Sequence, residues 1–118
     1  MALVESFREL TVWQRAIELS VAVYRMTAVF PKEEMYGLTC QIRRASVSVA
    51  SNIAEGQGRC SPGEFRQFPG MARGSNLELQ THLVIAERLG YGVASSIAEC
   101  EGLSFEVGRM LNGLMKTL

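Results

Sequence analysis

The sequence contains no aspartate, a single histidine at His82, and three widely spaced cysteines, Cys40, Cys60 and Cys100. One imidazole excludes a His-rich metal site, and cysteines without a CxxC pair indicate neither a zinc site nor a disulfide framework. We expect small buried or half-buried thiols in a reduced, cytoplasmic compartment, and a surface or half-buried histidine. No motif unites a nucleophile, a base and oxyanion donors, so the sequence predicts a protein without catalytic activity, metal or cofactor.

Long apolar runs and an excess of charge of one sign are also missing. A charge-free run such as 45–54 is far shorter than the roughly 18 apolar residues that a membrane span needs. The 118 residues carry a formal net charge of zero, with 47% hydrophobic and 20% charged residues. This composition is typical of a globular domain, here 1–118, and gives no general attraction to nucleic acid or membrane.

Helical periodicity is the pattern that the sequence does contain. Apolar residues recur at steps of three and four, which predicts helices over about 11–29, 34–55, 62–89 and 96–117. Short connections favour antiparallel neighbours, so we expect an all-α fold, an up-down-up-down four-helix bundle. The predicted starts are capping boxes at Thr11–Gln14, Ser61–Glu64 and Ser96–Glu99. The predicted core positions include Val12, Ala16, Leu19, Val23, Met26, Leu38, Ile42, Ala45, Val49, Ile53, Phe105, Val107, Leu111, Leu114 and Met115.

Pro69 and Gly70 conflict with the third predicted helix. Proline inside a helix removes a backbone hydrogen bond and costs about 3 kcal/mol, and glycine adds about 1 kcal/mol. We therefore expect a kink between Phe65 and Ala72. A helix that starts at Pro69 is the alternative, but Phe68 would be a poor cap.

The second predicted helix is apolar on two sides. Val47, Ala50 and Ala54 lie opposite its main apolar stripe. A helix that is apolar all round is usually buried all round, and in a bundle of four helices a second subunit could cover the extra side. The alternative is that these small side chains lie on a solvated face.

Five arginines, Arg43, Arg44, Arg59, Arg66 and Arg73, fall within 31 residues that contain only Glu55 and Glu64 as carboxylates. Arginine forks match phosphate oxygens, so these side chains are candidates for contacts with RNA. Arg66, Arg73 and Gln80 also repeat every seven residues, which places them near one helix face. The alternative is structural: Arg43 or Arg44 pairs with Glu55 or Glu78 inside the bundle or across a subunit interface.

Several short motifs together resemble one bacterial family of four-helix bundles. That family is named for open reading frames in intervening sequences of large-subunit ribosomal RNA genes, and the similarity spans nearly the whole chain. The motifs are FREL and VWQ at 7–14, FPKEE at 30–34, YGL at 36–38, QIRRA at 41–45, SNIAEG at 51–56, GS at 74–75, RLGY at 88–91 and MLNGL at 110–114.

The resemblance implies an antiparallel four-helix bundle that assembles as a homopentameric ring. It also implies similarity to the accessory protein of diversity-generating retroelements, which assists a reverse transcriptase and contacts RNA. No catalytic activity is attached to the family. The positions that match family motifs are Arg43, Arg44, Asn52, Glu55 and Ser75; we take Asn52, Glu55, Ser75 and Glu78 as candidate structural or interface residues.

Two functional hypotheses follow from the sequence. The first is a noncatalytic oligomeric scaffold whose partners are copies of itself and other proteins. The second is an RNA-binding accessory protein associated with ribosomal RNA or a reverse transcriptase, in which weak arginine patches act together around a ring.

Overall fold

The structure, a computed structural model, describes residues 6–57 and 62–117, apart from the side chains of residues 62–66. This part of the chain contains four α-helices and two short 3-10 helices, and it contains no strand. The predicted all-α class with four helices is therefore confirmed. The elements are η1 (Phe7–Glu9), α1 (Thr11–Thr27), η2 (Lys32–Glu34), α2 (Leu38–Gln57), α3 (Pro62–Arg88) and α4 (Ala94–Lys116).

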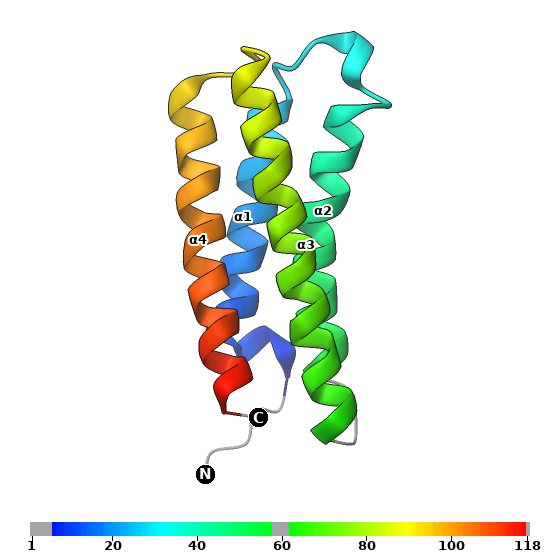
Figure 1. The fold of residues 1–118 in the computed structure, drawn as a ribbon, viewed down its shortest axis with the longest axis vertical. Coiled ribbons are helices and arrows are strands. Elements are labelled where there is room, and N and C mark those ends of the chain that lie inside the picture. The colour runs from blue at the N-terminus through cyan, green and yellow to red at the C-terminus, as the bar shows by residue number, and fades with distance from the viewer. Residues whose placement is uncertain (1–5, 58–61, 118) are drawn as a thin grey trace.

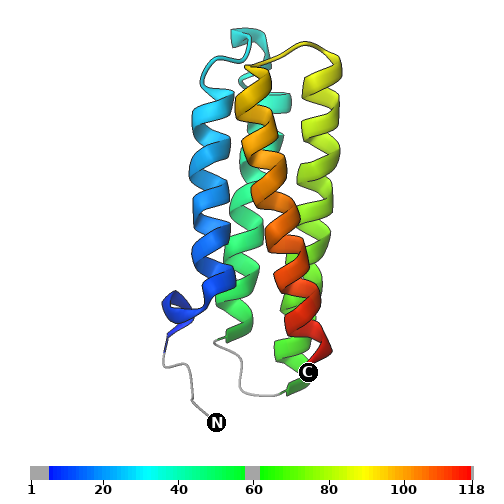
Figure 2. The same cartoon turned by 90° about the vertical axis from the view of Figure 1, so that its left-hand side faces the viewer.

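The four long helices lie side by side along the long axis of the molecule, and the chain ascends and descends through them in turn (Figure 1). Within the described residues, α1 and α3 each pack against α2 and α4 but not against each other. Figure 2 shows the same cyclic order, with α4 between α1 and α3. The groove between α1 and α2 therefore lies on the opposite side of the bundle from the groove between α3 and α4.

A single apolar core runs along the bundle, and most of the predicted core positions lie in it. Leu38, Leu114 and Met115 are only half-buried, and Phe105 is exposed, with 49% of the residue accessible. Its neighbours Ser104 and Val107 are buried, and residue 105 lies about 100° further round the helix than residue 104. The buried apolar residues are Val12, Ala16, Leu19, Ala22, Val23, Met26, Phe30, Ile42, Ala45, Val49, Ala50, Ile53, Ala72, Leu79, Leu83, Ala86, Ile97, Cys100, Val107 and Leu111.

The capping box predicted at Thr11 does not form. Thr11 is the first helical residue, Leu10 occupies the capping position, and no side chain caps the helix there. The Gln14 side chain instead donates from Nε2 to the Arg8 carbonyl oxygen at 2.9 Å. This hydrogen bond connects α1 to η1, so Gln14 joins two helices and does not form a capping box.

The capping box predicted at Ser96 is also wrong. Helix α4 begins at Ala94 after the extended residue Val93, because the preceding loop turns at Gly90 and Gly92, both with a φ of 74°. Ser96 already lies inside the helix. The box predicted at Ser61 falls outside the described residues.

Helix α2 begins after η2, later than expected, and a carboxylate from η2 caps it. Glu34 Oε1 accepts a hydrogen bond from the Leu38 backbone N–H at 3.2 Å. Glu34 Oε2 accepts a second hydrogen bond, of 3.0 Å, from the hydroxyl of Tyr91, which lies in the loop between α3 and α4. The Tyr91 ring also packs on Phe30, with ring centroids 5.6 Å apart. One carboxylate therefore joins two loops that are distant in sequence.

Helix α3 is continuous from Pro62 to Arg88, with Pro69 inside it. The alternative start at Pro69 is therefore wrong. The proline side chain is fully buried, so its apolar contacts offset part of the cost of the missing backbone hydrogen bond. The expected kink stays a prediction.

A ring of polar contacts joins each pair of neighbouring helices. We call it the polar belt. Between α1 and α2, Ser20 Oγ donates to the Ser46 carbonyl oxygen at 3.0 Å, and between α2 and α3 the hydroxyl oxygens of Ser48 and Ser75 are 2.9 Å apart. Between α3 and α4, Asn76 and Ser104 share two hydrogen bonds of 2.9 and 2.7 Å. Between α1 and α4, Arg15 Nε lies 3.1 Å from Glu106 Oε1.

The polar belt lies at one height of the bundle. Each helix supplies two belt residues, one for each of its neighbours. These two residues are one or two positions apart on α2, α3 and α4, and five positions apart on α1. At 1.5 Å per helical residue, the belt is at most about 7.5 Å thick. It therefore fixes how far each helix is displaced along its neighbours.

Ser104→Ala should weaken the belt at its most buried contact. The substitution leaves the Asn76 side-chain oxygen, in a residue that is 2% exposed, without its donor. We expect the free energy of unfolding to fall by about 1–3 kcal/mol in urea titrations. The exposed control Ser95→Ala should change it by less than about 0.5 kcal/mol. Equal stability of the two variants would show that the belt contributes nothing.

Tyr91→Phe should destabilise the protein in a pH-dependent way. The hydrogen bond to Glu34, and then burial, raises the pKa of Tyr91 above its ordinary value. The contribution of the hydroxyl is therefore fully present below about pH 10 and disappears as the pH rises through the raised value. Urea unfolding from neutral pH to about pH 11 tests this. Tyr36→Phe, at a residue 92% exposed, should match the wild type throughout, and a Tyr91 variant that did the same would contradict the account.

Candidate functional site

Arg43 is held against α1 by three contacts. Its Nε donates to Thr27 Oγ1 at 2.8 Å, and a terminal nitrogen lies 3.5 Å from the Tyr24 carbonyl oxygen. The guanidinium carbon also lies 4.6 Å from the centre of the Tyr24 ring, in a cation–π geometry. These contacts give Arg43 a structural role between α1 and α2.

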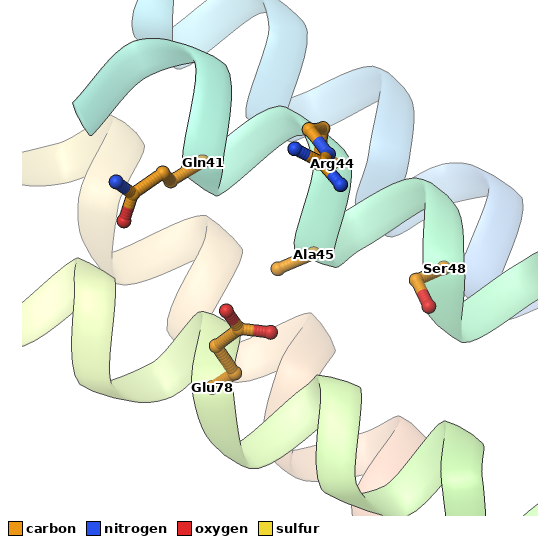
Figure 3. A pocket seen from close by; sticks show the side chains of 5 residues that line it. All are labelled: Gln41, Arg44, Ala45, Ser48 and Glu78. Atoms are coloured by element: carbon orange, nitrogen blue, oxygen red, sulfur yellow. The ribbon is translucent and has the colours of Figure 1, made fainter. Parts of the chain in front are cut away.

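Arg44 points about 100° away from Arg43 around α2 and lines an open groove between α2 and α3. The groove has a volume of about 390 Å³, and Arg44 and Glu78 face it from the two helices (Figure 3). The two side chains form no ion pair. Glu78 Oε1 instead lies 3.9 Å from Nε2 of His82. The predicted pairing of Arg44 with Glu78 is therefore not made within one chain.

His82 is more buried than we expected, with 8% of the residue exposed. Its Nδ1 is buried without a hydrogen-bond partner. The residue packs on the core side of α3, so it does not project into solvent as a surface histidine would.

Arg73 lies in a third place, the groove between α3 and α4. It lines a depression of about 330 Å³ together with Gln80, Phe105, Arg109 and other residues of the two helices. The predicted proximity of Arg73 and Gln80 is therefore confirmed. Among the described residues, neither Arg73 nor Arg109 forms an ion pair.

The remaining candidates lie in different places: Ser75 belongs to the belt, Asn52 contacts it, Glu55 is on the surface, and two arginines have no described side chain. Asn52 donates from Nδ2 to the Ser48 carbonyl oxygen at 2.9 Å, and Ser48 contacts Ser75. Glu55 is exposed on α2. Arg59 lies outside the described residues, and the same is true of the Arg66 side chain.

The three candidate arginines whose side chains the structure describes therefore lie beside three different pairs of helices. Arg43 lies between α1 and α2, Arg44 between α2 and α3, and Arg73 between α3 and α4. Sequence proximity did not reveal this separation, because residues 43 and 44 point about 100° apart on one helix.

Apolar side chains are exposed along the outer side of α1. We call Ile17, Val21, Tyr24 and Ala28 the α1 strip; the first three are 37–46% exposed. They line a depression of about 480 Å³. The sequence pattern predicts the core stripe of α1, but the same apolar residue types recur on the outer face of the helix and no motif distinguishes them.

The second apolar side of α2 continues this surface. Val47 is 42% exposed, whereas Ala50 is buried and Ala54 is half-buried. A hollow of about 260 Å³ lies here between α1 and α2. We call it the α1–α2 hollow; its lining residues are Trp13, Ile17, Ser20, Val47, Ala50, Ser51 and Ala54.

The cysteines form no metal or redox site in the described residues. Burial, followed by the nearby charges of Glu99 and Glu101, raises the pKa of the Cys100 thiol to about 11. Cys40 is half-buried, and both thiols are free. Within residues 6–57 and 62–117, no group of three His, Cys, Asp or Glu side chains could hold a metal ion. No helix in the same ranges has both the length and the apolar character needed to cross a membrane.

Comparison with solved structures identifies the fold. The chain superposes with a TM-score of 0.80 on a crystal structure from Bacteroides thetaiotaomicron, a protein of unknown function from the S23 ribosomal protein family. The two share 20% identity, and the match covers 90% of this chain and 99% of the other. At that identity the likeness concerns the fold alone. No curated protein matches the chain.

A family model covers most of the sequence. The model of the 23S rRNA-intervening sequence protein matches residues 8–113, which include most of η1 and nearly all of the four long helices. This range contains the motifs on which the resemblance was based, except for Phe7 of FREL and Leu114 of MLNGL. The chain therefore belongs to the 23S rRNA-intervening sequence protein family.

Proposed function

We propose that this protein is a noncatalytic oligomeric scaffold, an antiparallel up-down-up-down bundle that assembles with copies of itself into a homopentameric ring. The ring of five follows the family resemblance, and the bundle supplies the surfaces for it. In this role the protein positions other molecules and performs no reaction on them.

The α1 strip is the observation that carries this proposal. Val21 and Tyr24 are 44% and 46% exposed, and Ile17 connects them to the α1–α2 hollow. Contiguous apolar surface of this kind marks an interaction site more often than a solvated face. No described part of the chain covers it, so a second molecule is the natural occupant.

Val21→Glu should dissociate the assembly without unfolding the subunit. The side chain is already 44% exposed, so a carboxylate there costs little in a monomer but is desolvated in an interface. Sedimentation velocity should show a shift to the monomer with unchanged helical circular dichroism. Tyr36→Glu, at a residue 92% exposed in the connection before α2, should leave the assembly intact. A wild-type protein that is already monomeric at micromolar concentration would contradict the proposal.

RNA binding is the second candidate function. Arg44 and Arg73 are exposed, and neither forms an ion pair within the described residues. Free guanidinium groups can contact phosphates, and a ring would present each of them once per subunit, so that weak sites act together. Their positions in separate grooves favour contacts with a folded RNA that touches more than one face.

Arg44→Glu combined with Arg73→Glu should weaken RNA binding if this candidate is correct. Fluorescence anisotropy of a structured ribosomal RNA fragment, at several salt concentrations, should show lower affinity and a shallower salt dependence, by about one unit of slope per lost contact. Arg8→Glu with Arg88→Glu changes net charge equally and is the matched control. Absence of binding by the wild type at low salt would exclude the RNA role and leave the scaffold.

A further inference from the structure

The depression between α3 and α4 carries two positive charges and no negative one. Arg73 and Arg109 line it from the two helices, and the other described residues that line it are neutral. The carboxylates closest in sequence lie elsewhere: Glu106 Oε1 is 3.1 Å from Arg15 Nε of α1, and Glu78 borders the α2–α3 groove. In a chain of zero net charge, this depression is therefore a place where an anion is favoured.

The two arginines lie at nearly the same height on their helices. A β-carbon added to Gly108 of α4 would lie 3.3 Å from Nδ2 of Asn76 on α3, so these two residues are opposite each other. Because α3 and α4 run in opposite directions (Figure 1), the residues one turn before Asn76 lie opposite those that follow Gly108. Arg73 therefore faces the same part of the depression as Arg109. Two guanidinium groups held at one level repel each other, and an anion that contacts both removes this repulsion.

The chemistry of the depression changes along its length. Beyond the arginine pair, Leu77 and Phe105 are 53% and 49% exposed and form its apolar middle. Gln80 lines the far end, where its side-chain Nε2 donates to the Ser104 hydroxyl at 2.9 Å. From residue 73 to residue 80 a helix rises by about 10.5 Å. A ligand of that length meets charge first, then an aromatic surface, then an amide.

The size of the depression limits the ligand to a small molecule. Its volume of about 330 Å³ is near the lower end of the range of small-molecule sites. Gly108 supplies no side chain to fill it, and Asn76 is 2% exposed and bonded to the Ser104 carbonyl oxygen. The floor is therefore fixed, and the space above it is open.

We propose that this depression binds a phosphate monoester attached to a planar ring, the chemistry of a nucleoside 5′-monophosphate. The phosphate lies between Arg73 and Arg109, because two guanidinium groups match the nearly two negative charges of a monoester at neutral pH. The base stacks on Phe105, and its polar edge reaches Gln80. This inference goes beyond the scaffold role and does not depend on the ring.

The monoester distinguishes this site from a contact with the interior of an RNA chain. Each phosphate inside a chain is a diester with one negative charge, so it matches one guanidinium group and leaves the other without a partner. A dinucleoside monophosphate, whose only phosphate is a diester, should therefore bind less tightly than a mononucleotide with the same base.

Isothermal titration calorimetry of the full chain at low salt tests the site with defined probes. These are the ribonucleoside 5′-monophosphates of all bases, the matching nucleosides and dinucleoside monophosphates, and inorganic phosphate. The best monophosphate should bind about tenfold or more tightly than its nucleoside, its dinucleoside monophosphate or inorganic phosphate. The inference would be overturned if no monophosphate bound more tightly than inorganic phosphate, or if the diester bound as well as the monoester.

Substitutions separate the two halves of the site. Arg109→Gln should weaken binding of the best monophosphate about tenfold or more, because a charge-assisted contact with phosphate is lost. Arg88→Gln, at an exposed arginine of α3 outside the depression, is the matched control and should bind as the wild type does. Phe105→Leu should lower the affinity toward that of inorganic phosphate and leave phosphate binding unchanged. Equal affinities of Arg109→Gln and Arg88→Gln would overturn the inference.

The same protein samples separate this inference from the scaffold proposal. Sedimentation velocity reports the assembly, and calorimetry reports the ligand. A wild type that is monomeric and still binds the monophosphate would contradict the scaffold and support the site. A wild type that assembles but binds no monophosphate would overturn the site alone.

Discussion

The polar belt is the constraint on which the remaining geometry depends. Apolar packing alone tolerates sliding of one helix along another, because leucine and valine contacts carry little directional preference. Buried hydroxyl and amide groups do not tolerate it, since each lost partner leaves an unsatisfied polar atom. Ser46 and Ser104 are 0% exposed and Asn76 is 2% exposed, so their hydrogen bonds fix the relative heights of the helices. Features on opposite faces are therefore held level.

The four sides of the bundle differ in chemistry. The α1–α2 side carries the apolar hollow, and the α3–α4 side carries Phe105 and Leu77 beside Arg73 and Arg109. The α2–α3 side is polar, with Arg44 and Glu78 across an open groove. In the proposed ring, the α2–α3 groove is repeated once per subunit. The apolar hollow and the polar groove therefore lie on adjacent sides of one bundle, and both are bordered by α2.

The sequence predicts the helices and their core because both depend on local periodicity. It predicts helix starts poorly, because α2 is capped by Glu34, a residue of another element that is held by the distant Tyr91. The Asn76–Ser104 contact joins residues 28 positions apart, and no motif marks it. The arginines cluster in sequence but lie beside separate pairs of helices, since direction around a helix changes with every residue. Phe105 fits the apolar pattern of α4 yet is exposed, because a partly exposed face can be as apolar as a buried one.

Native mass spectrometry of the wild-type protein tests the central claim most directly. The account holds that neighbouring copies of the chain cover the exposed apolar surface of the α1 strip and close a ring. It predicts a single closed assembly of five copies with no species beyond it. A monomer, or a series of masses that grows without limit as concentration rises, would contradict the account.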